Sequence, residues 1–536
     1  MSHAALPTRV RLEGARFWTA DPAQPWARSI DIHDGHIAAV DAPARTDTPV
    51  ITLPNLVVTP GLIDAHLHLT LGADTLSQLD LSGVRSRAEF EAEVARACAE
   101  LPPGAWLRAH GWDERSWGGE RPTLDWLRAA GDRPAVAYRM DQHVCLVNHV
   151  VLTLMGATAD AATSCRCPAG GEIVRHASGA PTGLMLEQAA WQLVNPLVPK
   201  PDIHVARAAL VQACAHANRH GLTTVGSMEY AVDLHHVHDW LRANQREQLT
   251  LRVRATLLDR DWPVDLEFGS KFAGDALIAI VGYKSFVDGT LGSRTARMLQ
   301  PYRDDPQNSG MLVEFAAHST ERLQEWMRTV VKHGFSPSVH AIGDAALRVA
   351  LDCAATTDPA RLTRFEHVQT VHTDDVARMS GRIASMQPLH KCGDARVAPA
   401  RLGQERMHRF FRFRDLANAG ARLAFGSDWP IVSLDPRLGI RAAVTGLDDA
   451  GEPCGTDQNL TAHEALHAYT AGAADALRDP MIGRLAPGAH ADLAAWADDP
   501  FEHDWVRSLP TLAGTVLGGR VVWRSPALTG VLEVAR

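Results

Sequence analysis

The chain has 536 residues, of which 46% are hydrophobic and 21% are charged, and its formal net charge is −9. The length allows a large core and more than one domain, and the composition is that of a soluble globular protein. The negative charge, without a clustered lysine and arginine stripe, excludes a typical nucleic-acid-binding protein.

Two further features bear on the compartment in which the protein works. The chain begins MSHAALPTRVRLEGARFW, which lacks the apolar segment of a secretory signal, and no run approaches the roughly 18 apolar residues of a membrane span. Its eight cysteines are scattered, as is typical of reduced thiols. We therefore expect a cytoplasmic protein with no membrane partner.

Both ends of the chain read as short strands separated by turns. In residues 1–58, Asp34-Gly35 separates two alternating segments and predicts a hairpin. Residues 480–536 have the same character, with Gly518-Gly519 as a turn. Because chain termini often lie close together, these two parts predict one small β-sandwich domain built from both termini.

The first chemical motif is VVTPGLIDAHLHL, residues 57–69. Its apolar, β-branched start predicts a buried strand that continues past a kink at Pro60-Gly61. Asp64, His66 and His68 then alternate with apolar residues, so they share one face of the strand. Two imidazoles at this spacing can bind one divalent ion, and zinc favours histidine. The alternative is a strand that ends in polar residues with no metal.

Residues 59–479 show a different sequence pattern, in which predicted helices and strands alternate. Amphipathic helical stretches end at a glycine, as at Gly221, Gly334 and Gly420, and lead directly into an apolar strand. Repeated helix-to-strand units imply a parallel sheet. Eight candidate strands predict an α/β fold, a (β/α)₈ TIM-type barrel. These strands are VVTPGLIDAHLHL, LTTVGSM, LRVRATLL, IAIVGYKSFVDG, FSPSVHAIGD, RFEHVQ, RIASMQP and RLAFGSDWP.

The first and second barrel strands are separated by far more residues than one helix needs. Residues 70–203 are therefore predicted to form a large insertion over the barrel mouth. This segment is rich in tryptophan and contains the turn-rich sequence CPAGGEIVRHASGAPTG.

Polar residues interrupt the apolar barrel strands near their C-terminal ends, where the active sites of such barrels lie. Each has a structural alternative: a salt-bridged lysine, a core histidine or a capping aspartate. Convergence of all of them at one end of one barrel favours a functional site over these alternatives. The residues are His66, His68, Lys284, His340, His367 and Asp428.

This set of residues resembles the amidohydrolase superfamily of metal-dependent hydrolases. More narrowly, it is similar to the branch of YtcJ-like proteins and N-substituted formamide deformylases. The resemblance spans nearly the whole chain and is specific for the branch but not for a substrate. The segments that carry it are TPGLIDAHLHL, GGEIVRHASGAPTGLMLE, GYKSFVDGTLGSRTA, SVHAIGDAAL, RFEHVQ, SMQPLH, FGSDWP and GRLAPGAHADLAAW.

The resemblance implies a centre with two divalent metal ions, commonly zinc. His66, His68 and Asp428 would hold one ion, and His340 and His367 the other. Lys284 would be carboxylated and bridge both ions. Charge supports that modification, because an ammonium beside two cations is repelled whereas a carbamate can bind both.

The implied reaction is the hydrolysis of a bound carbonyl compound by a metal-activated hydroxide. Asp428 would take the proton of the water and deliver it to the leaving group. Asp64 is expected to accept the second N–H of a ligating histidine, since such histidines usually donate it to a neighbour.

Five other residues are candidate site residues, and three of them have an open structural alternative. His143 is expected to reach the substrate carbonyl, or else to form a structural hydrogen bond. Arg294 would bind a substrate carboxylate, or else pair with a nearby acid. Gln387 and His390 are expected to line the barrel mouth. Trp112 is either a substrate contact or part of the core of the insertion, and the second is favoured.

The sequence thus predicts a hydrolase of a non-peptide C–N bond, with an N-substituted formamide or N-acyl amide as its small-molecule substrate. One alternative keeps the metal centre but cleaves a lactone, a carbamate or a cyclic amide. A third hypothesis, a non-catalytic scaffold, is disfavoured because all six ligand positions are filled. Many relatives are dimers, so a homodimer is the assembly that the resemblance suggests.

Overall fold

The computed structural model describes residues 6–140, 142–156, 166–168, 171–229, 248–258, 264–272, 274–448 and 450–526. The chain divides into two compact units. Unit 1 comprises residues 1–69 and 214–536, and unit 2 comprises residues 70–213. Within the described ranges, no helix is both long enough and apolar enough to cross a membrane.

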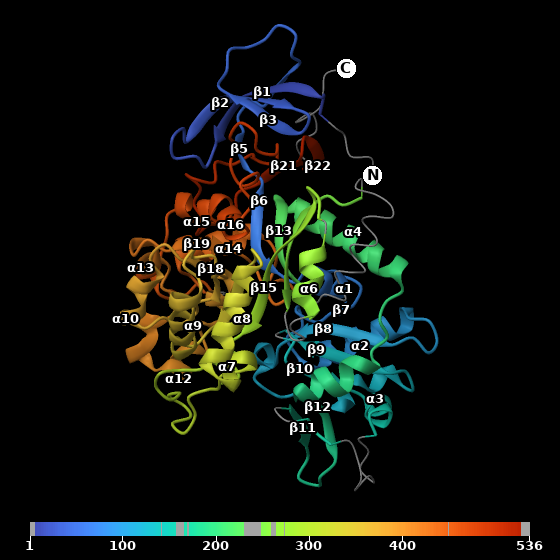
Figure 1. Ribbon diagram of the computed structural model, residues 1–536. Coiled ribbons are helices and arrows are strands. Elements are labelled where there is room, and N and C mark those ends of the chain that lie inside the picture. Colours follow the sequence, from blue (N-terminus) through green and yellow to red (C-terminus); the bar gives the residue numbers. More distant parts are fainter. Residues whose placement is uncertain are drawn as a thin grey trace. The chain divides into compact units, whose positions relative to one another are not determined.

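Unit 1 contains a sheet of eight strands, in the order β19-β18-β17-β16-β15-β14-β13-β6, and every neighbouring pair is parallel (Figure 1). Its strands coincide with the eight predicted from the sequence, which confirms the TIM-type α/β fold. They are β6 (Leu62–Leu67), β13 (Leu222–Glu229), β14 (Arg252–Leu258), β15 (Ile278–Phe286), β16 (Ser336–Ala341), β17 (Arg364–His367), β18 (Ile383–Met386) and β19 (Arg422–Phe425).

The two end strands of this sheet, β6 and β19, meet where the first and last parts of the barrel join. The backbone N–H of Asp428 donates to the carbonyl of His66 at 2.6 Å. A Cβ atom on Gly426 would lie 2.5 Å from the backbone nitrogen of His66 and 2.7 Å from Asp64 Oδ1. Only glycine permits this approach, so Gly426 brings the end of β19 against β6.

One helix of unit 1 is clearly amphipathic and packs against β16. In α8 (Thr320–Lys332), Leu323, Trp326, Met327 and Val330 are buried at helical spacing, and the Ser319 side chain caps the N-terminus. The other helices are α4 (Ile203–Arg219), shared with unit 2, α6 (Val264–Lys271), α7 (Glu314–His318), α9 (Asp344–Thr357), α10 (Thr373–Val376), α11 (Pro388–Asp394), α12 (Ala398–Leu402), α13 (Phe413–Asn418), α14 (Pro436–Thr445), α15 (Ala462–Ala468) and α16 (Ala471–Ala476).

A second sheet of unit 1 combines both ends of the chain, in the order β22-β21-β20-β5-β1-β2-β3, with β4 paired to β1. The termini therefore share one sheet, while a two-layered sandwich stays a prediction. The strands are β1 (Arg9–Trp18), β2 (Trp26–His33), β3 (His36–Val40), β4 (Val50–Thr52), β5 (Val57–Pro60), β20 (Leu493–Trp496), β21 (Leu512–Leu517) and β22 (Arg520–Arg524).

The segment expected as one kinked strand belongs to two sheets. β5 pairs with β1 and β20 of the terminal sheet, whereas β6 pairs with β13 of the barrel. The predicted kink at Pro60-Gly61 is thus the point at which the chain passes from one sheet to the other. Burial alone could not reveal this, because both halves are buried.

Unit 2 has its own six-stranded sheet, in the order β11-β12-β10-β9-β8-β7, and its own aromatic core. Trp112, Trp126 and Phe90 are almost fully buried in that core. The elements are α1 (Leu69–Thr75), which starts at the last residue of unit 1, β7 (Leu79–Asp80), α2 (Arg87–Glu100), β8 (Leu107–Trp112), β9 (Ala135–Arg139), β10 (Val144–Val147), α3 (His149–Leu154), β11 (Gly171–Arg175) and β12 (Pro181–Glu187).

A buried ion pair fixes the terminal sheet to the barrel within unit 1. Arg252, on β14, donates from Nε and Nη2 to the two carboxylate oxygens of Asp492, at 2.7 and 3.0 Å. The two side chains are only 4% and 3% exposed. Asp492 also accepts the backbone N–H of Gly518 at 2.7 Å.

Replacing Asp492 by asparagine should lower the free energy of unfolding by about 3–5 kcal/mol, because it leaves the buried guanidinium of Arg252 without its counter-charge. Chemical denaturation followed by circular dichroism measures this. The matched control is Asp47→Asn, which breaks the exposed Arg45–Asp47 pair and should change stability little. Equal effects of the two substitutions would show that the buried pair does not hold the sheets together.

Candidate metal centre

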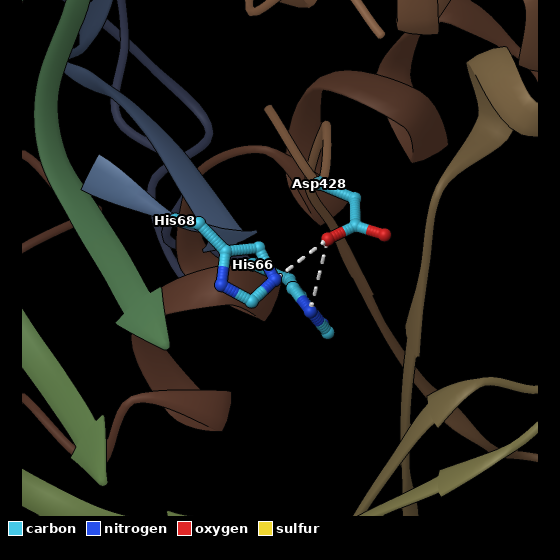
Figure 2. A group of neighbouring side chains, drawn as sticks. All are labelled: His66, His68 and Asp428. Atoms are coloured by element: carbon cyan, nitrogen blue, oxygen red, sulfur yellow. Dashed lines mark ion pairs between the residues drawn. The ribbon is translucent and has the colours of Figure 1, made fainter. Parts of the chain in front are cut away.

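Both histidines of the His-x-His motif direct their Nε2 atoms toward Asp428. His66 donates from Nδ1 to Glu366 Oε2 at 2.6 Å, and His68 Nδ1 lies 3.1 Å from the carbonyl oxygen of Met228. With Nδ1 of each ring as the donor, each Nε2 carries a lone pair and can only accept. These two Nε2 atoms lie 3.4 and 3.2 Å from Oδ1 of Asp428 (Figure 2).

Asp428 is held at this point by the turn that follows β19. Its backbone has φ +61°, and the preceding Ser427 donates from its backbone N–H and its hydroxyl to Asp64. Burial alone would raise the pKa of Asp428, but the adjacent His66 and His68 hold that pKa well below its ordinary value. The carboxylate is therefore charged at neutral pH.

The remaining expected ligands surround the same space. Lys284 Nζ lies 3.1 Å from His66 Nε2. The rings of His340 and His367 are 4.4 Å apart, and the ring of His367 is 5.0 Å from that of His66. The structure thus brings together all six residues that the sequence placed in a metal centre.

Burial sets the protonation of these groups. It lowers the pKa of His66 to about 4 and that of His340 to about 3, so both imidazoles are neutral at pH 7. Burial also lowers the pKa of the Lys284 ammonium. Neutral imidazole is the form that binds metals.

The donor atoms fit a divalent cation. Asp428 Oδ1, His340 Nδ1 and His367 Nδ1 are buried and have no hydrogen-bond partner among the described residues. Ligand atoms of one tetrahedral zinc ion lie about 3.3 Å apart when each bond is about 2.0–2.1 Å long. The distances from Asp428 Oδ1 to His66 and His68 match that spacing. A second group with metal-binding spacing consists of His367, His390 and Asp428.

Glu366 is a site residue that sequence reasoning missed. It is fully buried, it accepts the Nδ1–H of His66, and Arg364 Nε lies 3.0 Å from its Oε1. Burial would raise the pKa of Glu366, but Arg364 and His66 hold that pKa well below its ordinary value. The signal in the sequence was a charged residue inside an apolar strand, directly before His367.

Glu366 also corrects the expectation for Asp64. Asp64 accepts from the backbone N–H of His66 at 3.0 Å and from Ser427, not from an imidazole. The carboxylate that orients a histidine ring is therefore Glu366. Asp64 instead joins β6 to the turn that carries Asp428.

Two of the softer candidates have the surroundings that their structural alternatives describe. Arg294 forms a bidentate pair with Asp304 at 3.1 and 2.9 Å, the alternative given above; substrate binding by Arg294 stays a prediction. Trp112 is 1% exposed and donates to the carbonyl of Ala137 in the core of unit 2, as the favoured alternative states.

The other three candidates, His143, Gln387 and His390, each have a different polar environment. His143 pairs with Glu187 at 2.8 Å in unit 2. Gln387 is fully buried, and neither its amide oxygen nor its amide nitrogen has a hydrogen-bond partner within the described part of the chain. His390 Nε2 lies 3.9 Å from Asp428 Oδ2, so this residue belongs to the centre itself.

Comparisons with known proteins agree with this centre. The amidohydrolase family model matches residues 50–523. Protein LONG AFTER FAR-RED 3 of Arabidopsis thaliana is 31% identical over 97% of this chain and 92% of its own. The putative amidohydrolase YtcJ of Bacillus subtilis is 30% identical over 89% and 91% of the two chains. The N-substituted formamide deformylase of Arthrobacter pascens is 26% identical over 90% and 92%.

A solved structure shares both the fold and a measurable part of the sequence. A metal-dependent hydrolase from Pyrococcus horikoshii superposes with a TM-score of 0.77 at 28% identity, covering 93% of this chain and 99% of that one. With the family model covering most of the chain, these likenesses show that this chain belongs to the amidohydrolase family, in its YtcJ-like branch of metal-dependent hydrolases.

Proposed function

We propose that the protein hydrolyses a non-peptide C–N bond in a small molecule, most simply an N-substituted formamide or another N-acyl amide. The observation that supports this most is the convergence of two imidazole Nε2 atoms on one carboxylate oxygen of Asp428, beside Lys284, His340 and His367. A relative named N-substituted formamide deformylase, which aligns over 90% of this chain, favours that substrate class.

The proposed centre holds two divalent ions, with zinc as the expected metal. His66, His68 and Asp428 would hold the first ion, and His340 and His367 the second, with Lys284 carboxylated between them. Such ions supply Lewis-acid polarisation of a carbonyl group and lower the pKa of water.

Within this proposal Asp428 moves the proton. Its Oδ1 faces His66 and His68, which leaves Oδ2 to accept a proton from the water that attacks the carbonyl carbon. The same proton then passes to the amine nitrogen as the C–N bond breaks, so water and amide yield an acid and an amine. The low pKa of Asp428 keeps the carboxylate ready to accept that proton at neutral pH.

Glu366 and Arg364 orient His66 through hydrogen bonds to its ring and to its strand. Glu366 fixes the Nδ1–H tautomer of His66 and so keeps its Nε2 free. Arg364 also donates from Nη2 to the carbonyl of Ala65 at 2.7 Å, which ties it to the strand that carries His66.

The direct test uses metal-loaded protein and a matched set of substrates. Formamides and N-acyl amines should yield one amine per acid released, measured by chromatography, whereas lactones of similar size should react more slowly. Faster hydrolysis of lactones, carbamates or cyclic amides would favour the alternative bond types. Protein that binds no metal, even with zinc and bicarbonate added, would favour a non-catalytic scaffold.

Asp428→Asn should lower kcat by about 10²–10⁴-fold, because asparagine keeps an oxygen toward the histidines but cannot accept the proton. Steady-state kinetics and metal analysis of the same preparation measure this. We expect the variant to stay folded and to keep its metal. A variant that loses metal or solubility together with activity would contradict the proton-transfer role.

Glu366→Gln should weaken metal binding by about 10–100-fold, because His66 loses the carboxylate that fixes its tautomer. Competition with a chromogenic chelator measures the affinity. Glu325→Gln is the control, since Glu325 lies on an exposed face of α8 and pairs with Arg322. Unchanged affinity in Glu366→Gln would remove Glu366 from the centre.

Lys284→Ala should empty at least one metal site, because it removes the group expected to bridge the ions. Metal content per chain, measured by plasma emission spectrometry, reports this, and added short carboxylic acids should partly restore the lost ion. The exposed Lys271→Ala serves as the control. Full metal content in Lys284→Ala would argue against a bridging lysine.

A further inference from the structure

His390 lies on a short helix that is anchored on the side away from the centre. Helix α11 starts directly after β18, and the ammonium of Lys391 donates to the carbonyl of Gly455 at 3.0 Å. The thiol of Cys392 donates to the carbonyl of Leu447 at 3.1 Å. These two contacts hold the helix in place, so the position of the His390 ring is defined by the fold.

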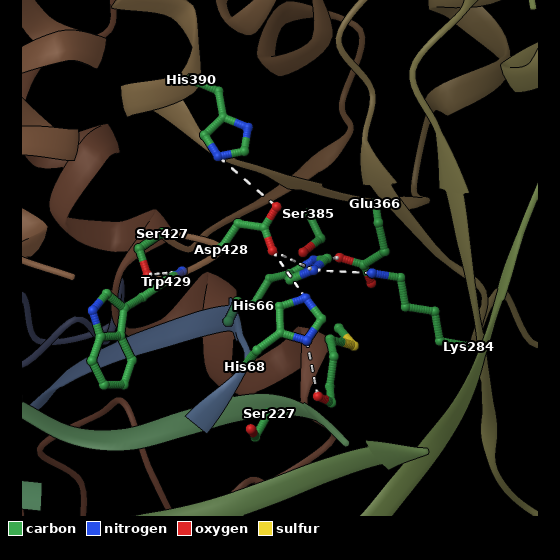
Figure 3. A network of polar contacts seen from close by, with 12 residues as sticks. His66, His68, Ser227, Lys284, Glu366, Ser385, His390, Ser427, Asp428 and Trp429 are labelled. Atoms are coloured by element: carbon green, nitrogen blue, oxygen red, sulfur yellow. Dashed lines mark hydrogen bonds and ion pairs between the residues drawn. The ribbon is translucent and has the colours of Figure 1, made fainter. Parts of the chain in front are cut away.

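The ring nitrogen of His390 is aimed at the centre. Its Nε2 lies 3.9 Å from Asp428 Oδ2, on the other side of the carboxylate from His66 and His68 (Figure 3). This atom is buried and has no hydrogen-bond partner among the residues that the structure describes. Buried polar atoms are normally satisfied, so an unsatisfied imidazole nitrogen at this position points to a missing partner.

His367 offers a second nitrogen atom that could bind a metal ion. Its side chain is buried, its Nδ1 is also without a partner in the described part of the chain, and its ring is nearly parallel to that of His390, with 12° between the planes and 6.3 Å between the centres. Donor atoms of His367, His390 and Asp428 all lie within 4.8 Å of one another. One divalent ion can therefore be reached from all three residues.

The number of ligands separates the two halves of the centre. Apart from the shared lysine, the first ion would have three protein ligands, His66, His68 and Asp428, which is the usual number in a catalytic zinc site. The second would have only His340 and His367 besides a modified lysine. His340 Nε2 lies 3.1 Å from the carbonyl of Gly289, so only its Nδ1 is available to this ion.

We propose that His390 is a direct ligand of the second metal ion, beside His367. The sequence had suggested only that His390 lines the barrel mouth. This assignment rests on the proposed two-metal hydrolase and deepens it, because it adds a ligand from α11 to those carried by the barrel strands.

The test compares metal binding by the full-length wild type, His390→Ala and His390→Gln, each dialysed against a fixed concentration of free Zn²⁺. The exposed His408→Ala is the matched histidine control. Metal per chain is measured by plasma mass spectrometry, and binding of Co²⁺ alone by visible absorption. His390→Gly with added imidazole tests whether a free ring can replace the missing ligand.

We expect about two ions in the wild type and in His408→Ala, and about one in both substitutions of His390, with the second ion bound more than about 10-fold more weakly. Imidazole should restore it in His390→Gly, and the Co²⁺ spectrum should change only in the His390 variants. Two ions at unchanged affinity in both His390→Ala and His390→Gln would overturn the assignment while leaving the proposed function standing. A wild type that binds no ion would overturn the proposed function, and the assignment with it.

Discussion

The centre depends on the junction between β6 and β19, the first and last strands of the barrel. His66 and Asp428 are far apart in the sequence, and they meet because the backbone N–H of Asp428 donates to the carbonyl of His66. That approach requires a residue without a Cβ atom at Gly426. If the strands stood further apart, Asp428 Oδ1 could not lie within metal-sharing distance of both imidazoles. The junction that brings β19 against β6 therefore also brings together the three proposed ligands of the first ion.

Much of this arrangement could be predicted from the sequence because it follows from periodicity. The two-residue period of a strand places His66 and His68 on one face, and helix-to-strand repeats imply parallel strands whose C-terminal ends meet. The segments that end in His340, His367 and Asp428 then had to converge. The TIM-type fold is confirmed, and the expected ligands lie together.

What the sequence could not show are the places where the backbone leaves its regular period. Glu366 and His367 are neighbours, so strict alternation would send only one of them into the barrel. His367 has φ +72°, outside the strand conformation, and both side chains therefore reach the centre. The change of sheet at Gly61 is likewise a departure from regular strand geometry, so the alternation of residues did not predict it. The position of His390 depends on tertiary contacts of α11, which leave no periodic signal.

The buried charges of Arg364 and Glu366 are energetically costly, and their role at the centre explains why they are there. Arg364 and Glu366 are both fully buried, and removing an ion pair from water costs more than its attraction usually returns. Here the pair has a second task, because an isolated buried Glu366 would take up a proton and could no longer accept from His66. Arg364 keeps Glu366 ionised, Glu366 holds the His66 tautomer, and Nε2 of His66 therefore remains an acceptor at 3.4 Å from Asp428 Oδ1.

The two oxygens of Asp428 therefore have different surroundings, which allows one carboxylate to serve two purposes. Oδ1 faces a pair of imidazoles whose other nitrogens are fixed by Glu366 and the carbonyl of Met228. Oδ2 faces His390, whose nearest ring nitrogen has no partner among the described residues. In the proposed reaction, Oδ1 would face the first ion and Oδ2 would hold the proton in transit. A symmetrical environment would make both oxygens ligands and would leave the reaction without a base.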